Sequence, residues 1–138
     1  MFRNSVRVLD LFDTSIQLRA GGHAEPGGGR DGAGPGLWTV AAHRAADDRS
    51  LHSDVWERHP AGQEVLCVLS GAITAYLRDH DDGGRPVATL GPGRALVVPA
   101  GCWHRLTVAE PGDLLVVTPR AGTEHERVHR DGSAGERS

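Results

Sequence analysis

Four potential metal-binding side chains fall in two short segments of the chain. Glu57, His59 and Glu64 lie in VWERHPAGQEVLCVLSG, and His104 lies in GRALVVPAGCWHRLTV, just after a Pro-x-Gly turn. Residues two apart on a strand face the same side, so Glu57 and His59 should point together. Glu64 can join them if the PAGQ turn folds the next strand back alongside. These nitrogen and oxygen donors suit a divalent metal ion.

Strands must position these side chains. Between Leu37 and Pro119, short runs rich in Val, Leu, Thr, Ile and Trp recur, each bounded by Gly, Pro or Asp. Many short strands without helices predict an all-β antiparallel sandwich or barrel, whose interior can bring His104 to the other three groups. The runs predict eight strands, at 37–44, 53–59, 63–70, 72–79, 86–90, 95–98, 103–109 and 113–118.

The remaining chain divides by composition. Residues 1–20 form an N-terminal arm with a predicted strand at 6–12. Residues 21–36 are half glycine and have few apolar side chains to offset the entropy of ordering, so they are expected to form a flexible loop. Residues 37–119 are the predicted barrel, and residues 120–138 form a polar tail.

The strand that follows Glu64 is apolar on both faces. If Glu64, Leu66 and Val68 point inward, then the apolar side chains that alternate with them point outward. A strand that is hydrophobic on both faces is covered on both faces. In a small barrel the outer cover is most simply a second subunit or the N-terminal strand. We therefore expect a homodimer to which residues 5–12 contribute.

Composition excludes several classes of partner. The 138 residues are enough for one domain around a single core. The net charge of −3 and the absence of long charge runs argue against nucleic acid or an anionic membrane as the main partner. No stretch is apolar enough to cross a membrane, and the N-terminus lacks the features of a signal peptide. Two distant cysteines fit neither a disulfide framework nor a redox motif, so a cytoplasmic protein is expected.

Together the two segments resemble the paired motifs of the cupin superfamily, which are small double-stranded β-helix (jelly-roll) barrels. The family's first motif is G-x5-H-x-H-x3-4-E-x6-G, and this chain has E-R-H-PAGQ-E-VLCVLS-G. The second motif is G-x5-P-x-G-x2-H-x3-N, and this chain has G-RALVV-P-A-G-CW-H-RLT-V. The departures are Leu51 for the opening glycine, Glu57 for the first histidine and Val108 for the final asparagine.

The resemblance implies that His59, Glu64 and His104 hold one divalent metal ion per chain. Those three alone match the two-His-one-carboxylate arrangement of Fe(II) sites. Glu57 is either a fourth ligand, which favours Mn(II) or Fe(II), or a catalytic base beside the metal. Zn(II) or Ni(II) can also occupy such a site, because intrinsic affinities favour the later metals. The alternative is a metal-free polar cluster, although burying two carboxylates without a cation is costly.

For function, the resemblance implies a metal-dependent enzyme that acts on a small oxygen-bearing organic molecule, of the dioxygenase, isomerase, cyclase or lyase type. The alternative is a non-catalytic cupin that binds or senses a small ligand. An enzyme needs a metal position open to solvent, whereas a binding site can be closed by side chains. The stretch TPRAGTEH resembles a tail that follows the barrel in some small bacterial cupins. Glu124 and His125 either fold over the barrel mouth or stay solvated.

Overall fold

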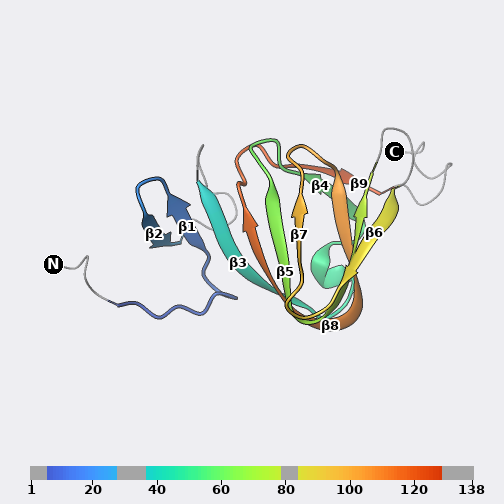
Figure 1. Ribbon diagram of the computed structural model, residues 1–138, viewed down its shortest axis with the longest axis horizontal. Coiled ribbons are helices and arrows are strands. Elements are labelled where there is room, and N and C mark those ends of the chain that lie inside the picture. Colours follow the sequence, from blue (N-terminus) through green and yellow to red (C-terminus); the bar gives the residue numbers. More distant parts are fainter. Residues whose placement is uncertain (1–5, 28–36, 79–83, 129–138) are drawn as a thin grey trace.

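The computed structural model describes residues 6–27, 37–78 and 84–128 and is nearly all β (Figure 1). Beside the strands there is one short 3₁₀ helix among these residues, η2 (Arg49–Leu51). The strands are β1 (Ile16–Arg19), β2 (His23–Pro26), β3 (Trp38–Ala45), β4 (Val55–Arg58), β5 (Glu64–Leu77), β6 (Arg85–Leu90), β7 (Ala95–Val98), β8 (His104–Thr118) and β9 (Glu124–Arg127).

The long strands β5 and β8 form an antiparallel pair that runs through the whole sheet. The second half of β8 also pairs with β3, and the first half of β5 pairs with β7. Figure 1 shows β3, β8, β5 and β7 as neighbours in this order. The first half of β8 pairs with β4, and the second half of β5 pairs with β6. Strand β9 pairs with the other edge of β4. The two halves thus build two walls around one interior, as a jelly roll does.

Glycines allow β5 and β8 to bend where they cross between the walls. Gly71 has a φ of +76°, a conformation that side chains disfavour. A Cβ on Gly71 would overlap the carbonyl of Pro111, and one on Gly112 would overlap the carbonyl of Ser70. The predicted breaks at 71 and at 110–112 are therefore bends inside continuous strands. The separate strands predicted at 63–70 and 72–79, and at 103–109 and 113–118, are wrong in this respect.

The interior is filled by the inward-facing side chains of β5 and β8. The predicted alternation is confirmed, because Glu64, Leu66 and Val68 are buried whereas Leu69 is 49% exposed. The apolar core, which these strands share with β3, β6 and β7, consists of Ala45, Leu66, Val68, Ile73, Leu90, Val98, Leu114 and Val116. A cluster of polar side chains lies at the N-terminal end of β5, at Glu64.

The N-terminal arm differs from its prediction. Residues 6–12 form no strand, and Val6 and Val8 are almost fully exposed. The first strand is instead β1, which pairs with β2 and β3. Because β2 lies within the stretch 21–36, the loop prediction is wrong for those four residues, and 28–36 lie outside the described residues.

The tail also contains regular structure. Strand β9 pairs with β4, while residues 129–138 lie outside the described part of the chain. The domain boundaries stay predictions. Among the described residues, no helix is both long and apolar enough to span a membrane.

Candidate metal centre

The structure brings together all four side chains singled out in the sequence. Glu57 is on β4, His59 directly follows that strand, Glu64 begins β5 and His104 begins β8. Glu57 and His104 are register partners across β4 and β8. One donor atom from each residue can be chosen so that all four lie within 4.8 Å of one another, a group that could hold a metal ion.

The histidine Nε2 atoms and the carboxylates converge. His104 Nε2 lies 2.8 Å from Glu64 Oε1, and His59 Nε2 lies 3.2 Å from Glu64 Oε2. Glu57 Oε1 is 3.4 Å from His59 Nε2 and 4.0 Å from His104 Nε2. The two imidazole rings are tilted by 46° with centroids 5.3 Å apart, so both rings present an edge to the carboxylates.

Hydrogen bonds behind the rings fix which nitrogen faces the centre. His104 Nδ1 lies 3.0 Å from the carbonyl oxygen of Cys102, which can only accept a hydrogen bond. His59 Nδ1 lies 2.8 Å from Thr123 Oγ1, and that hydroxyl donates to the carbonyl of Arg120. Both Nδ1 atoms are therefore donors, and both Nε2 atoms are oriented toward the cluster. Such outer contacts are how proteins orient histidine ligands of metals.

Two buried atoms in the cluster make no hydrogen bond of good geometry, although a neighbouring imidazole or carboxylate atom lies within 3.2 Å of each. They are His59 Nε2 and Glu64 Oε1. The other oxygen of Glu64 accepts a hydrogen bond from Thr118 Oγ1 at 2.7 Å. His59, Glu64 and His104 are each at most 3% exposed, so bulk solvent does not reach these atoms. A divalent cation between these atoms would satisfy both, so the donors present fit a metal ion.

Comparison with known proteins now decides the family. The family model described as "Cupin domain" matches residues 50–118, which is half of the chain. The chain belongs to the cupin family. A comparison with curated proteins finds no sequence match.

Solved structures are similar to this cupin over part of its length. A cupin-2 domain protein from Shewanella frigidimarina is 23% identical, with a TM-score of 0.44, over 61% of this chain and 70% of its own. Hydroquinone 1,2-dioxygenase from Sphingomonas sp. TTNP3, with 4-hydroxybenzoate bound, is 16% identical with a TM-score of 0.45. The match covers 59% of this chain and 58% of the dioxygenase chain. Hydroxypropylphosphonic acid epoxidase from S. wedmorenis, in complex with fosfomycin, is 23% identical with a TM-score of 0.44. The match covers 59% of this chain and 42% of the epoxidase chain. The chain spans less than two thirds of both named enzymes.

Mutual contacts keep the cluster of the cupin charged. Burial by itself would raise the pKa of both carboxyls and lower that of the imidazole. Contact with His59, helped by the charge of Arg120, nevertheless lowers the pKa of Glu57 to about 2. Glu57 and Glu64 raise the pKa of His59 to about 9. The contacts with His104 and His59 lower the pKa of Glu64. Without metal, the site therefore holds a protonated His59 between two carboxylates.

Glu57 is the exposed corner of the cluster. Its side chain is 27% exposed, and its Oε2 points away from the imidazoles toward the segment after β8. Arg120 Nη2 lies 3.3 Å and His125 Nε2 lies 2.9 Å from this oxygen. Of the two tail residues considered in the sequence, His125 lies over the cluster, whereas Glu124 pairs with Arg58 at 2.5 Å.

Sequence reasoning missed Arg120, Thr118 and Thr123. The polar tail has no apolar periodicity, and no spacing rule links these residues to the motifs. Thr118 is the one with a sequence signal, because it lies an even number of residues from Leu114 and Val116 on the inward face of β8.

The two tryptophans beside the cluster pack against arginine side chains. Trp56 is almost fully buried, with the guanidiniums of Arg78 and Arg105 each 5.3 Å from its ring centroid. Arg58 and Arg78 lie 4.9 and 4.8 Å from the ring of Trp103.

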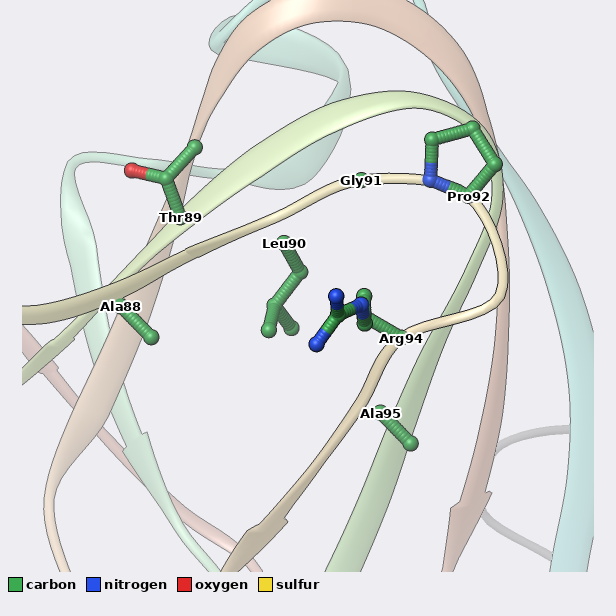
Figure 2. Close-up of a pocket in the computed structure, with 7 residues that line it drawn as sticks. All are labelled: Ala88, Thr89, Leu90, Gly91, Pro92, Arg94 and Ala95. Carbon is green, nitrogen blue, oxygen red and sulfur yellow. The ribbon is translucent and has the colours of Figure 1, made fainter.

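A hollow of about 590 Å³ lies at the turn between β6 and β7. Figure 2 shows Leu90 and Arg94 between the two limbs of this turn. It shares no residue with the metal-binding group, and its lining offers no acid, histidine or cysteine. The hollow is therefore not the candidate metal centre.

Proposed function

We propose that this cupin binds one divalent metal ion per chain through His59, Glu64, His104 and Glu57. Each histidine would bind through Nε2, since its Nδ1 is engaged by Thr123 or Cys102. Glu57 would bind through Oε1, since Arg120 and His125 contact its Oε2. The observation that carries the proposal is the convergence of four donor atoms, one from each residue, within 4.8 Å of one another at a site where three of the four residues are buried.

The proposed activity is that of a metal-dependent enzyme for a small oxygen-bearing organic molecule. Fe(II) or Mn(II) fits two imidazoles and two carboxylates, while Zn(II) or Ni(II) can replace them during purification. The metal would supply Lewis-acid polarisation of a substrate oxygen. Glu57, the group that faces both the cluster and the exposed side, would hold the metal or accept a proton from the substrate there.

Metal analysis tests the ligand set. Protein purified without nickel affinity resin and without added metal should retain about one ion per chain. His104→Ala should lower the metal affinity by more than the roughly 10- to 100-fold that outer-shell changes cost. His23→Ala, at an exposed position on β2, is the matched control and should retain the metal. Full metal retention by His104→Ala would overturn the assignment.

One observation favours a non-catalytic, ligand-binding cupin as the second candidate. Three of the four residues are buried, and Arg120 and His125 contact the fourth on its exposed side. A site closed in this way suits binding more than turnover. Azide titration of the Co(II)-loaded protein separates the candidates, because an enzyme needs a coordination position that azide can take. An unchanged visible spectrum would favour the second candidate.

We also propose that the cupin is a homodimer in which residues 5–12 of one copy cover the outer face of β5 and β7 of the other. Leu69 is 49% and Val97 is 54% exposed on these two strands. Val6 and Val8 are over 90% exposed, so the apolar side chains of the arm are also uncovered. These two apolar surfaces would cover each other in a dimer.

A further inference from the structure

Arg120 uses only part of its guanidinium within the described chain. Its Nη2 lies 3.3 Å from Glu57 Oε2, whereas its Nε is buried and has no hydrogen-bond partner among the described residues. A guanidinium presents parallel N–H bonds that match the two oxygens of a carboxylate. Glu57 therefore fills at most half of this pairing, and a buried donor left unpaired is costly.

A second donor lies beside Arg120. His125 Nε2 is 2.9 Å from the same oxygen of Glu57. An ionised carboxylate only accepts hydrogen bonds, so His125 must donate through Nε2–H. Glu57 Oε2 thus marks the point where two donors from the C-terminal segment converge. Its Oε1, attached to the same carbon, faces His59 and His104. A small anion with two oxygen atoms separated by only one or two carbons can therefore reach both the cluster and these two donors.

We propose that Arg120, together with His125, binds the carboxylate of a small organic acid whose adjacent oxygen reaches the metal. The inference rests on the proposed function, because the metal holds that second oxygen. In the complex the ligand carboxylate replaces Glu57 Oε2 on Arg120 and also pairs with Nε. Glu57 keeps Oε1 directed at the metal. The short path favours acids with a hydroxyl or keto oxygen on the carbon next to the carboxylate.

Glycolate binding to the Co(II)-loaded protein tests this proposal. Titration is followed by the visible spectrum and by calorimetry, for the wild type, Arg120→Gln and Arg120→Lys. Both variants should bind glycolate about tenfold or more weakly, since lysine keeps the charge but not the paired N–H geometry. Ethylene glycol, the neutral analogue, should bind the wild type at least about tenfold more weakly than glycolate. Arg127→Gln is the matched control, because Arg127 is an exposed arginine of β9 that pairs with Asp54.

Cobalt content and thermal melting are measured on the same samples, which separates two kinds of failure. Wild type that holds no metal would overturn the proposed function and this inference with it. Metal-loaded protein that does not bind glycolate, or whose Arg120 variants bind it as tightly as the wild type, would overturn the inference alone. If Arg120→Gln loses metal or does not fold, the Lys variant, which keeps a cation beside Glu57, decides the outcome.

Discussion

Each histidine of the cluster depends on a protein oxygen that is not itself a candidate ligand. For His104 this oxygen is the backbone carbonyl of Cys102, and for His59 it is the hydroxyl of Thr123. The difference matters, because a side-chain oxygen can be removed by substitution. Thr123 also links its own segment to the cluster, since it donates to the carbonyl of Arg120. Thr123 therefore both orients the proposed ligand His59 and connects it to the segment that covers the cluster.

Thr123→Val should weaken metal binding by roughly 10- to 100-fold, because His59 loses the acceptor that orients it. Competition with a chromophoric chelator measures the affinity. Thr89→Val is the matched control, since Thr89 pairs with Thr74 at an exposed position on β6. If the two variants have equal affinities, Thr123 has no role in orienting the ring.

Metal binding should release a proton from His59. The pKa of His59 in the folded protein, about 9, lies above the ordinary value of 6.5 for histidine. The stability that this group gives the metal-free protein is therefore fully present below pH 6.5 and is lost as the pH rises through about 9. The metal needs the Nε2 lone pair, so at about pH 7.5 binding must expel about one proton from this ring. Calorimetry in buffers of different ionisation enthalpy counts the protons. A heat independent of the buffer would contradict the protonated state.

The chemistry of the site could be predicted from the sequence because it lies in two local motifs. Strand alternation placed Glu57 with His59, the short PAGQ turn allowed Glu64 to join them, and a barrel interior could bring in His104. The resemblance implied that His59, Glu64 and His104 share a metal ion. What surrounds Glu57 could not be predicted in the same way. Arg120 lies 63 residues from Glu57 in the chain, in a polar tail without periodicity, and only the pairing of β9 with β4 brings its segment to the site.

At the scale of elements, the strands that were predicted correctly are those with a local hydrophobic pattern. The apolar runs of β5, β7 and β8 were found because their inward residues alternate. The arm at 6–12 has alternating valines too, yet it has no partner strand among the described residues, and pattern alone cannot supply one. Conversely, β1, β2 and β9 are short and mostly exposed, so they depend on neighbours rather than on hydrophobic pattern.

Gly112→Ala should destabilise the fold, because the added Cβ would overlap the carbonyl of Ser70 at the bend shared by β5 and β8. The free energy of unfolding should fall by about 2 kcal/mol or more. Chemical denaturation gives the value. Gly91→Ala is the control, since a Cβ there meets nothing within 4 Å and the backbone is not in the left-handed region. Equal stability of the two variants would show that the bend tolerates a side chain.

At the scale of the whole molecule, the sheet is open and its outer surface is unevenly covered. Strands β2, β6, β7 and β9 each have a single partner strand among the described residues. On the outer face beside β7, Val97 is the register partner of Val65, and Cys67 is the partner of Ala95. This apolar surface continues to Leu69. In the proposed dimer, the arm of a second copy, with its exposed Val6 and Val8, would cover this surface.

The proposed dimer leads to the prediction that Val6→Asp/Val8→Asp sediments as a monomer, whereas the wild type sediments at twice 14.7 kDa. Charge introduced on the arm would have to be buried against the outer face of β5 and β7, and an unpaired buried charge is costly. Val87→Asp is the matched control, because Val87 is a partly exposed valine on β6 and should leave the dimer intact. Sedimentation velocity over a range of concentrations measures the mass. A monomeric wild type, or a dimeric double variant, would contradict the role of the arm.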